Sequence, residues 1–206
     1  MARVLKDYPN VAVKLESLEG RVDFGRVFGR RNPIHIELGS GKGTFLVNQA
    51  LAQPDVDFLG IEWASRYYRY AVDRVGRWPV PNVRIIRADA AAFLAEYVPH
   101  NSVDCFHIYF PDPWPKRRHN KRRFFCDTNL RYLVRILKPA GIIRAATDHA
   151  DYFQSIEGLV AAERSLERIE FTPAAGASDA ELTGTNYERK YLAQGRAIFY
   201  IAVRKR

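Results

Sequence analysis

Short apolar runs alternate along most of the chain with longer segments in which apolar residues recur every three or four positions. Runs bounded by glycine or proline are typical of buried strands, and the longer period is typical of helices packed on a sheet. Five such strand-then-helix units predict an α/β fold with a doubly wound, mostly parallel sheet. The predicted strands are 33–38, 56–63, 83–87, 103–110, 141–147, 166–171 and 197–203, the last of them antiparallel. The predicted helices follow Gly43, span 65–77, follow Asp89, and span 124–137 and 150–165.

An acidic residue stands at the end of each of the first five predicted strands. Because the carboxyl ends of parallel strands meet at one edge of a sheet, we expect these residues to line a common site. Solvated acids placed at random would not be expected to fall so regularly. The five acids are Glu37, Glu62, Asp89, Asp112 and Asp148.

The first predicted strand runs into a glycine-rich turn that contains Gly39, Gly41 and Gly43, with Glu37 two residues upstream of the first glycine. Glycines supply positive φ angles and let a ligand approach the backbone closely. A dinucleotide fingerprint has the spacing G-x-G-x-x-G, and a pyrophosphate prefers a helix N-terminus with no acid beside it. The G-x-G-x-G spacing and the acid therefore disfavour an NAD-dependent oxidoreductase. They favour a cationic, hydroxyl-rich ligand such as S-adenosylmethionine, which carries a sulfonium, an ammonium and a ribose.

Glu62 ends the second predicted strand, 23 positions after Gly39. A βαβ unit places a ribose-binding acid about 20 residues beyond its glycine motif, which favours that role for Glu62. The alternative is an acid near a helix N-terminus that interacts with the helix dipole. Asp89, followed by the small Ala90, can hydrogen-bond an adenine amino group or cap the next helix, and the two roles can coexist.

A stiff and then basic loop, residues 110–123, follows the fourth predicted strand. Its three prolines fix φ and lack an N–H, so the loop is neither helix nor sheet interior. A fixed acid, Asp112, and an aromatic plane, Trp114, before clustered positive charge suit a flat base on a phosphate backbone. Trp114 either stacks on that base or wedges the loop, and a solvated basic turn is the simpler alternative, which the Pro-Asp-Pro-Trp prefix disfavours. The residues expected to hold phosphates are Lys116, Arg117, Arg118, Lys121, Arg122 and Arg123.

The composition agrees with a nucleic-acid partner. The 206 residues include 32 Lys and Arg against 23 Asp and Glu, which gives a formal net charge of +9. That excess favours an anionic partner, with nucleic acid ahead of a membrane surface. We expect a cytoplasmic protein with packed free thiols, because there is no apolar signal region, no bilayer-spanning run and no C-x-x-C pair. The five histidines show no metal-ligand spacing, so no metal is expected.

Two further regions are less regular. Residues 1–31 are mixed and moderately basic, and we interpret them as an N-terminal extension that adds RNA contacts or covers an edge of the sheet. Residues 32–206 are expected to form a single domain. Within it, residues 172–185 are expected to be flexible, because they are rich in Pro, Ala, Gly and Ser. The segment 185–191, taken by itself, is compatible with an ordinary loop.

These motifs together resemble the bacterial tRNA (guanine-N7)-methyltransferases, a family of class I S-adenosylmethionine-dependent methyltransferases. The resemblance runs in family order from about residue 20 onward. The glycine motif is shared by all class I methyltransferases, whereas the Pro-Asp-Pro-Trp-Pro-Lys prefix before a basic run is highly specific. The matching elements are Ile36 to Gly43, Gly60 to Glu62, Ala88 to Ala90, Phe110 to Lys116, Thr147-Asp148 and Thr185-x-Tyr187-Glu188.

The resemblance implies a Rossmann-like fold and methyl transfer from S-adenosylmethionine to N7 of a guanine in the tRNA variable loop, at tRNA position 46. It implies that Asp112 is catalytic. The cofactor side is implied to comprise Glu37, Gly39, Gly41, Gly43, Glu62, Asp89, Ala90 and Asp112. The tRNA side is implied to comprise Lys116, Arg117, Arg118, Arg122, Arg123, Asp148, Thr185, Asn186, Tyr187 and Glu188. Two positions depart from the family pattern: Asn186, where a charged residue such as Lys is frequent, and His149, where Asn is frequent.

Two rival functions remain open from the sequence. One is another nucleic-acid base methyltransferase, which would act on an exocyclic amine through a Pro-Pro-aromatic loop in the same position. Asp112 and the long basic run argue against it. The other is a methyltransferase-like protein that only binds RNA, which the acids at all five strand ends disfavour. The sequence leaves open whether the protein is a monomer or a homodimer.

Overall fold

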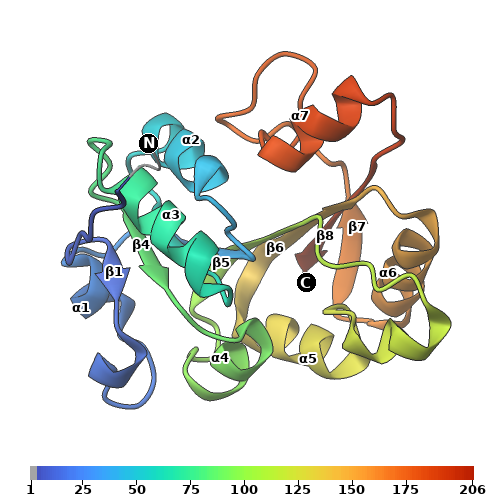
Figure 1. The fold of residues 1–206 in the computed structure, drawn as a ribbon. Coiled ribbons are helices and arrows are strands. Elements are labelled where there is room, and N and C mark those ends of the chain that lie inside the picture. The colour runs from blue at the N-terminus through green and yellow to red at the C-terminus, as the bar shows by residue number, and fades with distance from the viewer. Residues whose placement is uncertain (1–3) are drawn as a thin grey trace.

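The computed structural model describes residues 4–206 as one eight-stranded sheet with helices on both of its faces (Figure 1). Across the sheet the strands follow the order β1-β4-β3-β2-β5-β6-β8-β7. The first six strands in this order are parallel, and β8 is antiparallel to both of its neighbours. The predicted doubly wound, mostly parallel sheet with an antiparallel last strand is therefore confirmed. The strands are β1 (Ala12–Val13), β2 (Ile34–Leu38), β3 (Asp57–Ile61), β4 (Val83–Ile86), β5 (Val103–Tyr109), β6 (Leu137–Thr147), β7 (Leu166–Ile169) and β8 (Phe199–Lys205).

The helices pack in two groups because successive strand residues point to opposite faces of the sheet. On β3, Phe58 belongs to the core beneath α2 and α3, whereas its neighbour Leu59 belongs to the core beneath α1, α4, α5 and α6. The helices are α1 (Phe24–Phe28), α2 (Thr44–Ala52), α3 (Ser65–Val75), α4 (Ala90–Glu96), α5 (Asp127–Ile136), α6 (Ala150–Ala162) and α7 (Asn186–Ala193), with 3₁₀ helices η1 (Leu15–Ser17) and η2 (Arg117–Arg122).

The strand order reverses between β2 and β5, the two central strands. In open α/β sheets, ligands bind in the crevice at the carboxyl ends of the strands where the order reverses. The two strands are in register, with Glu37 opposite His107. The glycine turn leaves the end of β2 and the 110–116 segment leaves the end of β5, so the fold brings these two motifs to the carboxyl ends of two neighbouring strands.

Three segments differ from the sequence predictions. The helix expected over 124–137 is shorter, because Leu137 already pairs with Val103 as the first residue of β6. The basic run is not wholly irregular, because it coils into η2. The segment 185–191 is more than a loop: Thr185 caps α7 by accepting a hydrogen bond from the backbone N–H of Glu188.

The N-terminal segment joins the sheet and the core. Ala12 of β1 pairs with Ile85 of β4, so this segment covers an edge of the sheet. Val22, Phe24 and Phe28 are buried in the core beneath α4 and α5. Residues 1–3 of the predicted extension lie outside the described residues, and the domain boundary at residue 31 stays a prediction.

The helices of the structure were compared with what a membrane-spanning helix requires. Among the helices of residues 4–206, none combines the length and the apolar character that crossing a bilayer requires.

Candidate active site

The five acids expected at strand ends lie at the carboxyl ends of five neighbouring parallel strands. In the order of the sheet, Asp89 follows β4, Glu62 follows β3, Glu37 is the penultimate residue of β2, Asp112 follows β5 and Asp148 follows β6. All five therefore leave the sheet at one edge, the edge at which the strand order reverses.

Glu37 is a buried carboxylic acid whose Oε2 has no hydrogen-bond partner within the protein. Burial, with a smaller contribution from the nearby Glu62 carboxylate, raises the pKa of Glu37 to about 8. Beside it, the glycine turn has positive φ at Gly39, Gly41 and Gly43, a conformation that side chains disfavour. A buried acid with an unused oxygen next to open backbone is suited to a cationic ligand.

Glu62 holds the glycine turn in place. Its Oε2 accepts a hydrogen bond from the N–H of Gly41, and its Oε1 accepts one from the N–H of Ala64, both at 2.8 Å. A carboxylate offers about four acceptor positions, so each oxygen retains one for a ligand hydroxyl. The ribose-binding role and the local structural role are thus compatible in the same side chain.

Asp89 is exposed and caps α4, because its Oδ1 accepts a hydrogen bond from the N–H of Ala92 at 2.9 Å. Ala90 is the first residue of that helix. Of the two roles considered for Asp89, the capping role is present in the structure. The adenine contact stays a prediction.

Asp112 lies exposed in a segment with an unusual backbone. Phe110 and Trp114, on either side of it, have φ angles of 52° and 44°, which is uncommon for residues with side chains. The N–H of Phe110 donates to the carbonyl of Ala146 on β6 at 2.7 Å and so fixes the start of the segment. Strained residues that the surrounding structure holds in place cluster at functional sites, so this backbone supports a functional role for the Asp112 loop.

Trp114 packs inside its own loop. Its ring lies 5.9 Å from the ring of His119 in an edge-on arrangement, and the Arg122 guanidinium lies 4.9 Å from the indole centroid. Of the two roles left open for Trp114, wedging the loop agrees with these contacts. Stacking on a base stays a prediction.

Tyr187 of α7 lies near the start of the Asp112 loop. Its ring is half exposed and lies 6.0 Å from the ring of Phe110. Desolvation raises the pKa of Tyr187, and Tyr67, Tyr191, Asp112 and Glu62 raise it further. Tyr187 therefore lies within electrostatic range of carboxylates from both the β3 and the β5 side of the crevice.

Glu188 behaves differently from its neighbour. It is fully buried, and its carboxylate accepts hydrogen bonds from the backbone of residues 182–184, from the Thr183 hydroxyl and from the Tyr200 hydroxyl at 2.9 Å. Desolvation raises the pKa of Glu188, but these donors outweigh it and hold the pKa below its usual value. The last part of the stretch 172–185, which was expected to be flexible, is thus held by hydrogen bonds from residues 182–184 to one carboxylate. The tRNA contact predicted for Glu188 stays untested, and its oxygens are engaged inside the protein.

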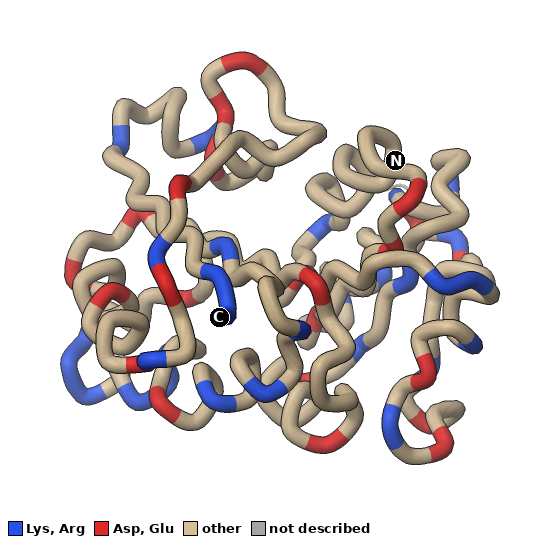
Figure 2. The backbone as a smooth tube through the Cα atoms, turned by 180° about the vertical axis from the view of Figure 1, so that it is seen from behind, with Lys and Arg blue, Asp and Glu red and all other residues tan. Residues whose placement is uncertain are grey.

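The basic run divides into exposed and buried members. Figure 2 shows it at the periphery of the molecule, and Lys116, Arg117, Arg118 and Arg122 are exposed. Only 6% of Arg123 is exposed, and it donates to the Pro113 carbonyl at 2.8 Å, to Ser155 and to Asp151, while the phosphate contact predicted for it stays a prediction. Its charge is used inside the protein to anchor the loop, because a buried guanidinium requires such partners.

Two further residues of the predicted tRNA side have partners that the sequence did not indicate. Asp148 is ion-paired with Arg196, a residue for which no sequence motif gave a signal. Asn186 donates to the Thr44 hydroxyl at 2.8 Å. Thr44 directly follows the last motif glycine, which is the one signal that could have marked it.

A row of buried polar side chains lies beneath the site, on the face of the sheet that carries Glu37. His107 bonds to Tyr109 through Nδ1 at 2.9 Å and to His35 through Nε2 at 3.2 Å. Burial lowers the pKa of His35 to about 4, lowers that of His107 well below its usual value, and raises that of the Cys105 thiol to about 12. These groups are therefore uncharged at neutral pH.

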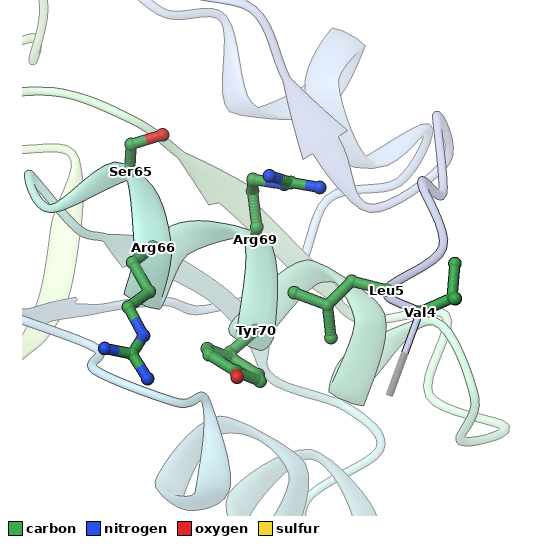
Figure 3. Close-up of a pocket in the computed structure, with 6 residues that line it drawn as sticks. All are labelled: Val4, Leu5, Ser65, Arg66, Arg69 and Tyr70. Atoms are coloured by element: carbon green, nitrogen blue, oxygen red, sulfur yellow. The ribbon is translucent and has the colours of Figure 1, made fainter. Parts of the chain in front are cut away.

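A surface pocket lies elsewhere, along the outer side of α3 (Figure 3). It contains none of the predicted site residues, and the guanidinium of Arg66 lies 5.9 Å from the centroid of the Tyr70 ring. We therefore place the candidate site at the sheet edge, where the acids and the glycine turn meet. The lining residues of the pocket are Val4, Leu5, Ser65, Arg66, Arg69 and Tyr70.

The strand order and the glycine turn, with acids at consecutive strand ends, define a class I methyltransferase fold. In agreement, the family described as "Putative methyltransferase" matches residues 31–201. The chain is 37% identical over 90% of its length to the tRNA (guanine-N(7)-)-methyltransferase of Alkalilimnicola ehrlichii, of which 78% is covered. It is 33% identical over 98% of its length to the enzyme of that name from Enterococcus faecalis, of which 94% is covered. The chain belongs to the tRNA (guanine-N7)-methyltransferase family.

Solved structures agree on the fold. The 16S rRNA methyltransferase KamB superposes with a TM-score of 0.61, at 12% identity, over 88% of this chain and 91% of that one. A SAM-dependent methyltransferase from Aquifex aeolicus gives a TM-score of 0.56, also at 12% identity, over 88% of this chain and 87% of that one. At such identities the likeness establishes the architecture and does not assign a substrate.

Proposed function

We propose that this protein transfers a methyl group from S-adenosylmethionine to N7 of a guanine in the variable loop of tRNA, at tRNA position 46, forming 7-methylguanosine. The observation that carries the proposal is the placement of Glu37, Glu62 and Asp112 at the carboxyl ends of the neighbouring strands β2, β3 and β5 in a chain of this family. In this proposal the enzyme works in the cytoplasm, where tRNA is modified, as a monomer or a homodimer.

The residues at this end of the sheet are chemically suited to bind S-adenosylmethionine. The unused Oε2 of Glu37 would accept a hydrogen bond from a cationic ammonium group, and the free acceptor positions of Glu62 would accept ribose hydroxyls. A Cβ on Gly39 would meet no protein atom within 4 Å, so the turn is open to a ligand. When bound, S-adenosylmethionine supplies the electrophilic methyl carbon.

The reaction asks for positioning more than for proton transfer. Guanine N7 has an in-plane lone pair and no proton at neutral pH, so no strong general base is required. Holding N7 in line with the methyl carbon can be worth about 7–11 kcal/mol in favourable cases. We propose that Asp112 accepts hydrogen bonds from the guanine N–H donors and stabilises the positive charge that the base acquires. The fixed backbone around Asp112 would keep this carboxylate preorganised.

The target must be an accessible nucleotide. In A-form RNA, N7 lies in a deep and narrow major groove that side chains do not read, so an unpaired or splayed-out guanine is required. A variable-loop nucleotide meets that requirement. We propose that Tyr187 borders the base and that exposed Lys116, Arg117, Arg118 and Arg122 hold the phosphates.

The direct test is incubation with methyl-labelled S-adenosylmethionine and unmodified tRNA, followed by nucleoside analysis by mass spectrometry. We expect label in 7-methylguanosine from the variable loop. Label on an exocyclic amine would favour the rival base methyltransferase, and RNA binding without cofactor affinity would favour a pure RNA-binding protein. As a residue-level test, Asp112→Ala should abolish turnover with unchanged thermal stability, and near-normal turnover would refute its role.

A further inference from the structure

Three side chains with metal-binding atoms meet inside the protein. In the register of β2 and β5, His35 lies opposite Cys105, and His107 follows two residues later on the same face. One ligand atom from each of the three lies within 4.8 Å of the other two. Cys105 and His107 are buried, so this is an interior cluster and not an exposed acidic group.

The spacing of the two imidazoles matches that of two ligands on one ion. Two nitrogens that each lie about 2.0–2.1 Å from a tetrahedral Zn²⁺ are separated by about 3.3 Å. Nε2 of His107 and Nδ1 of His35 are 3.2 Å apart, so binding would replace their hydrogen bond without moving the rings apart. The Cys105 thiol donates a long, weak hydrogen bond of 3.7 Å to the Phe106 carbonyl, which an ion could readily replace.

The hydrogen bonds around His107 resemble those that support metal-binding histidines. Such histidines usually bond through their other ring nitrogen to a polar group, which fixes the tautomer and the ring orientation. His107 uses Nδ1 in this way on the Tyr109 hydroxyl at 2.9 Å. Arg144 in turn donates to that hydroxyl at 3.4 Å. His107 is therefore held with Nε2 directed at His35.

We propose that His35, Cys105 and His107 bind one Zn²⁺ ion, with water as the fourth ligand. The ion would join β2 to β5 beneath the crevice and act as a structural fastener between the two central strands. On binding, the Cys105 thiol loses its proton to solvent and the thiolate bonds to the metal, with no change of oxidation state. The site stands apart from the proposed methyl transfer, which does not depend on it.

The first test uses metal alone. Full-length protein is stripped with a chelator, titrated with Co²⁺ and followed by absorption spectroscopy. We expect one Co²⁺ per chain, with the visible bands of a tetrahedral ion and a near-ultraviolet thiolate-to-cobalt band, all removed by one equivalent of Zn²⁺. Absence of the thiolate band in the wild-type protein would overturn the proposal, as would the spectrum of an octahedral ion.

The second test uses variants that the chain itself supplies. Cys105→Ser should lose the thiolate band and the rise in melting temperature that Zn²⁺ gives, whereas Cys126→Ser, at the other cysteine, should retain both. Tyr109→Phe should lower the affinity for the metal ion about 10- to 100-fold while leaving the Co²⁺ absorption spectrum unchanged. Melting curves in chelator show whether each variant is folded. A thiolate band that persists in Cys105→Ser, or one lost in Cys126→Ser, would place the metal elsewhere and refute the site.

Discussion

Asn186 donates a hydrogen bond to Thr44 at 2.8 Å, across 142 positions of sequence. The bond joins the first residue of α7 to the first residue of α2. A second bond, from Asn48 to the carbonyl of Gly184, joins the same two segments at 3.4 Å. Because Thr44 directly follows the glycine turn, the predicted tRNA-binding segment is attached to the predicted cofactor-binding turn. The Asn186 amide therefore serves this attachment.

Removing the Asn186 amide should loosen α7 from α2. We expect Asn186→Ala to lower the free energy of unfolding by about 0.5–1.5 kcal/mol, the usual net value of one hydrogen bond. Chemical denaturation of Asn186→Ala, Thr44→Ala and the double variant forms a double-mutant cycle that isolates the pair. If the two single effects simply add, the bond makes no contribution in solution.

Glu37 should make stability fall as pH rises. Its pKa is about 8 in the folded protein against an ordinary value of 4.5, so between these pH values the folded state holds a proton that the unfolded state has lost. Stability from this group is full below pH 4.5, declines through the window and is constant above pH 8. We expect Glu37→Gln, which is always neutral, to be increasingly more stable than wild type across that window. Urea denaturation at several pH values measures the difference, and parallel profiles would contradict the assignment.

The same acid should link cofactor binding to proton release. A cationic ligand favours the ionised carboxylate, so S-adenosylmethionine affinity should rise with pH up to about 8 and then level off. Calorimetry in buffers of different ionisation enthalpy counts the released protons. Glu37→Gln should bind more weakly and release none from this position, whereas proton release unchanged in that variant would assign the linkage to another group.

Replacing Arg122 with Ala and replacing Arg123 with Ala should affect different properties of the protein. Arg123→Ala removes three internal hydrogen bonds and the packing on Tyr152, and should destabilise the protein by about 1.5–3 kcal/mol. Arg122→Ala should leave the melting temperature nearly unchanged but weaken tRNA binding and reduce the salt slope by about 1. Thermal melts and filter binding at several salt concentrations measure both. A stable Arg123→Ala, or an Arg122→Ala with the wild-type slope, would refute the division of the basic run.

Gly60 should not tolerate a side chain. A Cβ there would lie 2.5 Å from Leu46 Cδ1 and 2.6 Å from Ser40 Oγ, so Gly60→Ala should cost about 1–3 kcal/mol through overpacking. Gly158 is the matched control, because a Cβ in that part of α6 meets nothing within 4 Å. Gly158→Ala should stabilise the protein by about 0.5–1 kcal/mol through helix propensity. Equal melting temperatures for the two variants would contradict the packing described around Ser40.

Apolar periodicity was sufficient to predict the fold because the strands β2, β3, β4 and β5 are each buried at all but at most one position. The element ends were less accurate: Pro139 signals that α5 ends nearby, but it does not indicate that Leu137 already pairs with Val103 as the first residue of β6. Helix α7 escaped prediction although Thr185 and Glu188 have the T-x-x-E spacing of a helix N-terminus, and Thr185 does cap the helix. That spacing does not encode the contact of the Glu188 carboxylate with the Tyr200 hydroxyl.

The acids at the strand ends were predicted from their positions in the sequence alone, and the structure places them at one edge of the sheet. Burial could not be predicted in the same way. Arg122 and Arg123 are adjacent and identical in type, yet one is exposed and the other is buried against Tyr152 of α6. Likewise His35, Cys105 and His107 show no metal-ligand spacing, because they come together only through the register of two strands.

The position of β8 in the sheet determines the order in which the strands can fold during synthesis. β8 lies between β6 and β7, and β7 pairs with no other strand of the described chain. The ribosome must therefore release residues 199–205 before Leu166–Ile169 can dock. Until then the nascent protein exposes the open edge of β6, a surface on which chaperones or neighbouring nascent chains can act.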